Sequence, residues 1–131
     1  MKTYWQEEIE TLPRPKLEQL QLEKFRISLS QALKSPGYAQ MYRERGIDQN
    51  CLQSLDDVRK LPFTSKEDLR QNYPYNLLTV PKEDVVRMHC TSGTTGNPAA
   101  VLYSRHDLHS WANLIARSLY AAGARASDVF Q

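Results

Sequence analysis

Cysteine is scarce in this sequence, and there is little charge of one sign. The two cysteines, Cys51 and Cys90, lie far apart and form no C-x-x-C pair, so unpaired thiols in a reducing compartment are expected rather than a disulfide framework. Seventeen Lys and Arg residues face fifteen Asp and Glu residues, for a formal charge of +2. This small and evenly spread charge argues against binding to nucleic acid or to a membrane surface.

Long apolar runs are also missing. The N-terminus has no apolar segment of the signal-peptide kind, and no stretch approaches the length of a membrane span. The cytoplasm is therefore the predicted location. With 40% hydrophobic and 24% charged residues in 131, the composition is typical of one folded globular domain and not of a disordered chain.

Apolar spacing and capping residues predict five helices, over residues 16–34, 36–45, 54–60, 65–72 and 105–122. The second would begin at Ser35-Pro36 and end at Gly46. Capping boxes are predicted at 54–57, at 64–67 with Thr64 as the cap, and at Ser104 with Asp107. Phe25 and Trp111 stand at core-stripe spacing and are predicted to be buried.

Two strands are predicted after the helical part, over Val85–Cys90 and Ala99–Tyr103, and Asp128–Gln131 has the character of a further strand. We therefore predict an α/β fold. Residues 1–75 would form an all-helical N-terminal subdomain, and 76–131 the start of a larger α/β domain, truncated at its C-terminus. Strands without neighbours leave backbone groups open to pairing, so self-association through exposed edges is expected.

The segment between the two strands, Thr91–Pro98, has the composition of an anion-binding loop. It contains four hydroxyl side chains, two glycines and no acid. Glycines permit close approach of the backbone, and consecutive N–H groups and hydroxyls suit a polyphosphate. It is not the P-loop of NTPases, because no lysine is present and Pro98 stands five residues after Gly93; a G-x-G-x-x-G motif is absent too. An ordinary surface hairpin loop is the alternative.

The histidines and Cys90 support weaker hypotheses. His106 and His109 stand three residues apart at the start of a helix, but further ligands are lacking nearby, so two exposed histidines are expected and no metal site. His89 is either a phosphate contact or a strand histidine whose ring N–H is satisfied by a hydrogen bond. Cys90 has no evident base partner and is taken as a small packing residue. No catalytic residue is assigned.

Several segments, in order, resemble the phenylacetate–CoA ligase family of the acyl-adenylate-forming superfamily. Thr91–Pro98 resembles the superfamily's phosphate-binding signature. Leu61–Arg70, with the sequence LPFTSKEDLR, resembles the family segment LPFTTKEDLR. The similarity extends through Tyr73-Pro74, Val85–His89 and Tyr103–Ala112, and it covers nearly the whole chain.

The resemblance implies a two-step reaction. An aryl, phenylacetate-like carboxylate attacks the α-phosphate of Mg-ATP, which gives an acyl-adenylate and pyrophosphate; the thiol of CoA then displaces AMP. The cofactors implied are ATP, Mg²⁺ and CoA. In such enzymes the loop wraps the β- and γ-phosphates, a role that the resemblance carries onto Thr91, Ser92, Gly93, Thr94, Thr95, Gly96 and Asn97. The chain would be an N-terminal fragment, inactive by itself.

The loop departs from the family pattern. Asn97 replaces the lysine usual before the loop proline, Ala99 stands where Thr or Lys is frequent, and Leu102 replaces a glycine. Arg87 and Arg105 are candidates to supply the missing positive charge. The alternatives are a related enzyme that adenylates a different acid, and a non-catalytic phosphate-binding or interaction module.

Overall fold

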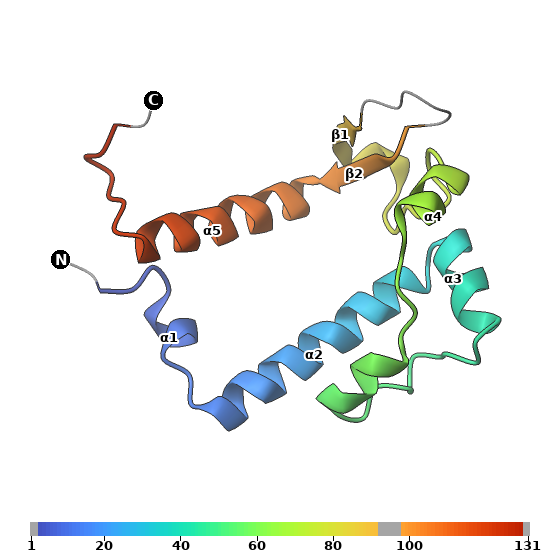
Figure 1. Cartoon of the computed structure of the whole chain (residues 1–131), viewed down its shortest axis with the longest axis horizontal. Helices are drawn as coiled ribbons and strands as arrows, with labels where there is room; N and C mark the ends of the chain where they lie inside the picture. The colour runs from blue at the N-terminus through green and yellow to red at the C-terminus, as the bar shows by residue number, and fades with distance from the viewer. Residues whose placement is uncertain (1–2, 92–97, 130–131) are drawn as a thin grey trace.

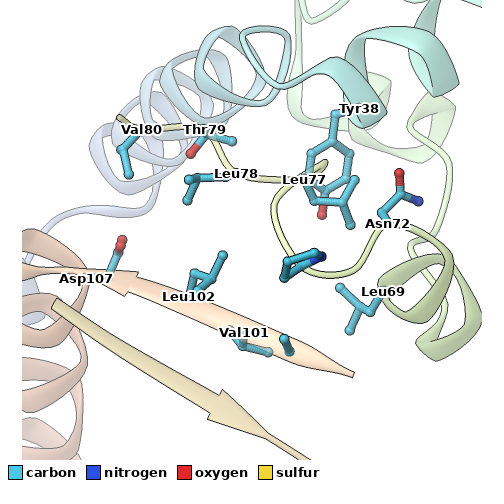
Figure 2. Close-up of a pocket in the computed structure, with 12 residues that line it drawn as sticks. Tyr38, Leu69, Asn72, Leu77, Leu78, Thr79, Val80, Val101, Leu102 and Asp107 are labelled. Carbon is cyan, nitrogen blue, oxygen red and sulfur yellow. The ribbon is translucent and has the colours of Figure 1, made fainter. Parts of the chain in front are cut away.

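The computed structural model describes residues 3–91 and 98–129. Its elements are, in order, α1 (Glu7–Glu10), α2 (Arg14–Ala32), α3 (Pro36–Arg43), the 3-10 helix η1 (Leu55–Lys60), α4 (Lys66–Gln71), the 3-10 helix η2 (Lys82–Asp84), β1 (Val85–Cys90), β2 (Ala100–Ser104) and α5 (Arg105–Ala121). Figure 1 shows α2 and α5 as the two long helices. α1 lies near one pair of their ends, and the short helices and the sheet lie toward the other pair. The fold is mixed, with helices around a small two-stranded sheet.

The predicted helices are present, with corrections at their starts. α2 begins at Arg14 and not at residue 16, because Pro15 is tolerated in a first turn, where its missing N–H has no helical partner. Residues 55–60 form a 3-10 helix. The cap of α4 is Ser65 and not Thr64, since the Ser65 hydroxyl accepts a hydrogen bond from the Asp68 N–H. Ser35 caps α3, and Gly46 follows its end with a φ of 65°.

Three capping boxes are formed, at Ser54–Asp57, Ser65–Asp68 and Ser104–Asp107. In the first, the Lys60 ammonium 2.6 Å from the carboxylate and the donors of Ser54 hold the pKa of Asp57 well below its usual range. In the second, hydrogen bonds from the Ser65 hydroxyl and N–H lower the pKa of Asp68. The boxes satisfy first-turn N–H groups that have no helical acceptor.

β1 and β2 form an antiparallel pair in which Cys90 lies opposite Ala100 and Arg87 opposite Tyr103, with an irregularity between Val85 and Arg87. β2 begins at Ala100, one residue later than predicted. Asp128 and Val129 are not in a strand, and the rest of the strand predicted there lies outside the described residues.

The core is small. It consists of Leu29 from α2, Tyr42 from α3, and Ile47 and Leu52 from the segment that follows; each is at most 8% exposed. Burial raises the pKa of the Tyr42 hydroxyl, and also that of the neighbouring Cys51 thiol. Together these contacts join α2 to α3 and η1.

The burial predicted for Phe25 and Trp111 is wrong, since these side chains are 40% and 42% exposed. Leu114, Ile115 and Leu119 of α5 are also exposed. The apolar spacing identified one face of α5, but within residues 3–91 and 98–129 only its first turns reach the sheet. Periodicity predicts which face of a helix is apolar and not what covers it.

The first residues of the chain pack against the far end of α5. Trp5 Nε1 donates to Asn113 Oδ1 at 2.6 Å, and the Trp5 ring lies 6.0 Å from that of Tyr120. Gln6 Oε1 accepts from both Asn113 Nδ2 and Arg117. These contacts join the N-terminal segment to α5 at the left of Figure 1. They connect residues on the two sides of the predicted domain boundary at residue 75, and that boundary stays a prediction. No helix of the described part has the length and apolarity needed to cross a bilayer.

Leu52 is 1% exposed in the core, so Leu52→Ala should leave a cavity. We expect it to lower the free energy of unfolding by about 2–5 kcal/mol, measured by urea denaturation. The control is Leu114→Ala, at a side chain 55% exposed, which should cost less than about 1 kcal/mol. Equal losses in both variants would contradict this core.

We propose that the isolated chain associates with itself through the edge of β1 that pairs with no strand within residues 3–91 and 98–129, because an open edge offers backbone groups for pairing. Met88, on β1, is 50% exposed, and Met88→Lys should shift the mass measured by light scattering toward the monomer. Val129→Lys adds the same charge outside the sheet, at a residue 88% exposed, and should not. A monomeric parent chain at high concentration would refute the proposal.

Candidate functional site

The β1–β2 pairing brings together the two ends of the segment predicted to bind phosphate. Thr91 N donates to Ala99 O at 3.0 Å, and Ala99 N donates to Thr91 Oγ1 at 3.3 Å. Ala99 is 3% exposed, whereas Thr91 is exposed. The structure therefore places both ends of the segment at one end of the sheet.

Of the residues predicted to contact phosphate, only Thr91 belongs to the described part of the chain. The other six, Ser92, Gly93, Thr94, Thr95, Gly96 and Asn97, lie outside the described residues. Their assignment therefore stays a prediction. Thr91 directly precedes these six residues and Pro98 directly follows them, and the structure describes both.

Three aromatic rings pack together where the sheet meets α5, one each from β1, β2 and α5. The His89 ring on β1 lies edge-on, 5.0 Å from Tyr103 on β2 and 5.8 Å from Trp111 on α5. Tyr103 and Trp111 stack at 5.7 Å with an interplanar angle of 15°. His89 is exposed, and within residues 3–91 and 98–129 its ring makes no hydrogen bond, so these contacts confirm neither prediction for His89.

Neither arginine that was considered as a substitute for the missing lysine lies next to the ends of the loop. Arg87 precedes Thr91 by four strand residues, about 13 Å at the rise of a β-strand. It lies beside Leu108 and Trp111 of α5. Arg105 follows β2, at the end of the sheet farther from the loop, where it lies near Glu83 and Asp84.

A cavity of about 160 Å³ lies on the other side of β2, between the strand and the helical part. Its lining comes from four segments, namely α3, α4 with the chain that leads to β1, β2, and the first turn of α5. It consists of Tyr38, Leu69, Asn72, Pro74, Leu77, Leu78, Thr79, Val80, Ala100, Val101, Leu102 and Asp107. Most of these side chains are apolar, and the volume is that of a small apolar group such as one ring.

The polar side chains around the cavity are mostly engaged with each other or with the backbone. Asn72 Nδ2 donates to Asp68 O at 2.8 Å, and Asn72 Oδ1 accepts from Asn76 at 2.5 Å. The Asp107 carboxylate accepts from the Ser104 N–H and hydroxyl. The lining thus combines mostly apolar side chains with a few polar groups that already have hydrogen-bond partners.

Sequence reasoning missed the cavity because its lining is contributed by four separate segments. The one local signal is Pro36-Gly37. Gly37 N donates to Asn76 O at 2.8 Å, and the buried Ser35 hydroxyl donates to the same oxygen at 3.3 Å. A Cβ at Gly37 would lie 2.6 Å from Asn72 Oδ1 and 2.8 Å from Leu77, which both line the cavity.

The remaining candidates form no site in the described part. His106 and His109 are exposed, and within residues 3–91 and 98–129 no three His, Cys, Asp or Glu side chains lie close enough together to hold a metal. Cys90 is an exposed free thiol, so its predicted packing role is not seen.

Gly37→Ala should push α3 away from the cavity wall. We expect a loss of about 1–3 kcal/mol in the free energy of unfolding, as for overpacked core positions, measured by urea denaturation. The matched control on the same helix is Gln40→Ala at an exposed side chain, which should stay within about 0.5 kcal/mol. Equal or greater stability of Gly37→Ala would show that the close approach is not needed.

Comparison with known proteins points to one family. No family model matches the chain. Among curated proteins it is 48% identical over 121 residues to the phenylacetate–coenzyme A ligase of Pseudomonas putida. It is 45% identical over 122 residues to that of Thermus thermophilus, and 42% over 121 residues to that of Escherichia coli K12. Each match covers 92% of this chain but only 27–28% of the relative.

A solved structure agrees with these matches. A 2-hydroxyisobutyryl-CoA ligase, in complex with 2-HIB-AMP and CoA in the thioesterification state, superposes with a TM-score of 0.87 at 30% identity. The superposition covers 97% of this chain and 28% of that ligase. The chain is thus similar to phenylacetate–coenzyme A ligases along nearly its whole length, and it spans about 28% of the length of the relatives that it matches.

Proposed function

We propose that the chain forms the N-terminal part of an ATP-dependent acid–CoA ligase that activates an aryl, phenylacetate-like carboxylic acid. The observation that carries the proposal is the 42–48% identity to phenylacetate–CoA ligases over nearly the whole chain. In the reaction, a carboxylate oxygen bonds to the α-phosphorus of ATP as pyrophosphate leaves. The CoA thiol then bonds to the acyl carbon as AMP leaves.

The part of this chain in the reaction would be to hold the phosphates of ATP with the segment Thr91–Asn97. The geometry that supports this role is the pair of hydrogen bonds between Thr91 and Ala99, which brings both ends of that segment to one end of the sheet. Backbone N–H groups, hydroxyls and the amide of Asn97 would donate to phosphate oxygens. Such donors stabilise developing negative charge when they are already oriented before the reaction.

Neither arginine near the sheet supplies the cation that a lysine at position 97 would provide. Arg87 and Arg105 lie away from the Thr91–Ala99 end of β1 and β2. Phosphate binding would then depend on neutral donors and on Mg²⁺ bound with the ATP. Mg²⁺ binds through phosphates and one or two carboxylates, and the described residues contain no acidic cluster for it.

The finer architecture belongs to this proposal too. Residues 1–75 would be a helical subdomain, and 76–131 the first strand–loop–strand–helix unit of a larger acyl-adenylate-forming domain. The adenine, acyl and CoA contacts would come from the rest of the full-length protein. ATP and CoA as substrates are consistent with the predicted cytoplasmic location.

A different acid is the second candidate. It is favoured by the solved structure, since that relative is a ligase of 2-hydroxyisobutyrate, a small aliphatic acid, and not of an aryl acid. ATP–pyrophosphate exchange by the full-length protein, with a panel of aryl and aliphatic acids, distinguishes the two. Exchange with none of the acids would leave a non-catalytic module and overturn the proposed function.

The 131-residue chain by itself should form no acyl-adenylate with any aryl acid, whereas the full-length protein should. Adenylation needs ATP and carboxylate to be held together in attack geometry, which is worth about 7–11 kcal/mol of barrier, and a phosphate loop alone cannot do this. Trapping with hydroxylamine, read as hydroxamate, is the measurement. In the full-length protein, Gly93→Val should reduce the rate at least about 100-fold, because a Cβ would hinder close approach to phosphate.

The matched control is Gly46→Val, also at a glycine but far from the loop and with a φ of 65°. It should lower the melting temperature through backbone strain without changing the adenylation rate of the folded protein. Hydroxamate formed by the 131-residue chain, or an unchanged rate for Gly93→Val, would contradict the loop assignment.

A further inference from the structure

We infer that Thr91 is a positioning residue, which ends the β1–β2 ladder through its side chain and thereby sets the separation of the two ends of the phosphate-binding segment. The inference rests on the proposed function, because it deepens the role of that segment. It is argued from residues that the structure describes, namely Thr91 and Ala99, and from the rings of His89, Tyr103 and Trp111.

The hydrogen bonds of this pair depart from the regular antiparallel pattern. In a hydrogen-bonded pair, the two opposite residues exchange N–H···O=C bonds in both directions. Here Thr91 N donates to Ala99 O at 3.0 Å, as expected, but Ala99 N donates to the hydroxyl oxygen Thr91 Oγ1 at 3.3 Å in place of the carbonyl. The side chain substitutes for the backbone, so the chain can leave strand geometry at Thr91 while the pair stays closed.

The burial of Ala99 makes this substitution necessary. Ala99 is 3% exposed, so water cannot readily replace a lost partner of its N–H. Buried backbone N–H groups are almost always paired. With the carbonyl of Thr91 not used in this pair, an acceptor side chain at position 91 serves as this partner, and a hydroxyl also keeps its own hydrogen to donate to a ligand.

The aromatic rings join the two strands to α5 farther along the sheet. His89 stands two residues before Thr91, and its ring contacts Tyr103 and Trp111 at 5.0 and 5.8 Å between ring centroids. These contacts hold β1, β2 and α5 together and thereby support the strand pairing that ends at Thr91. A segment whose two ends are already fixed loses less conformational entropy when a ligand orders it.

The first measurement is amide hydrogen exchange at Ala99 in the 131-residue chain, by NMR. Thr91→Val keeps the branched shape and removes the acceptor, so Ala99 exchange should accelerate about fivefold, as for loss of one hydrogen bond. Thr91→Ser keeps the hydroxyl and should stay within about twofold of the parent chain. Unchanged exchange of the Leu29 and Leu52 amides shows that both variants remain folded, and Thr91→Ala serves as a second variant without an acceptor.

The second measurement is binding of inorganic tripolyphosphate, followed by chemical shifts in the same samples. We expect Thr91→Val and Thr91→Ala to weaken the apparent Kd about fivefold or more and Thr91→Ser to leave it within about twofold. Unchanged Ala99 exchange in Thr91→Val would overturn the inference, even with weakened binding, because Thr91 would then be only a direct ligand. Accelerated exchange with unchanged binding would overturn it as well.

Failure of the proposed function has a different signature. In that case the parent chain itself shows no saturable shift with tripolyphosphate, whatever the exchange rates are, and the positioning role falls with it. Failure of the inference alone leaves the binding by the parent chain intact.

Discussion

The antiparallel pairing of β1 with β2, from Val85 opposite Ser104 to Cys90 opposite Ala100, is the interaction on which the candidate site depends. It brings Thr91 and Ala99 together although seven residues separate them in the chain. It also places His89 and Tyr103 on the face that meets Trp111, and Ala100 and Leu102 in the wall of the cavity. A two-stranded ribbon is marginally stable alone, so these contacts with α5 and with the helical part also support the pairing.

The helical part supports the sheet from the other side. The core of Leu29, Tyr42, Ile47 and Leu52 orders α2 and α3, and α3 contacts the turn at Asn76 through the close approach of Gly37. That turn leads into the cavity wall and then into β1. The position of the strand that precedes the loop therefore depends on contacts made far from it. The N-terminal residues add a second set of contacts, because they bind Asn113 and Arg117 of α5.

The similarity to phenylacetate–CoA ligases and the local geometry lead to a particular view of phosphate binding here. Relatives at 42–48% identity are phenylacetate–CoA ligases, but this chain has Asn97 where the family pattern has lysine. Because Arg87 and Arg105 lie away from the Thr91–Ala99 end of the sheet, the proposed loop would bind phosphate through oriented neutral donors. Such donors contribute most when their orientation is fixed in advance, which gives the ladder end at Thr91 its importance.

The sequence by itself determined the local elements, because their causes are local. Ser35, Ser54 and Ser104 cap helices through side chains that reach N–H groups within three residues, and Gly46 and Gly123 end helices with positive φ. The strands on either side of Thr91–Pro98 followed from their apolar β-formers, and the resemblance along the chain indicated the same ligases to which the comparisons found it similar.

Only the tertiary structure decided which apolar faces are covered and which distant residues meet. The spacing of Phe25 and Trp111 marked apolar faces, yet both side chains are substantially exposed, because burial depends on a second element that spacing does not identify. The contact of Trp5 with Asn113 joins residues 108 apart, and the cavity combines four segments. The Thr91 hydroxyl was predicted only as a phosphate ligand, since its bond to Ala99 arises from strand register, which pairing across the chain determines.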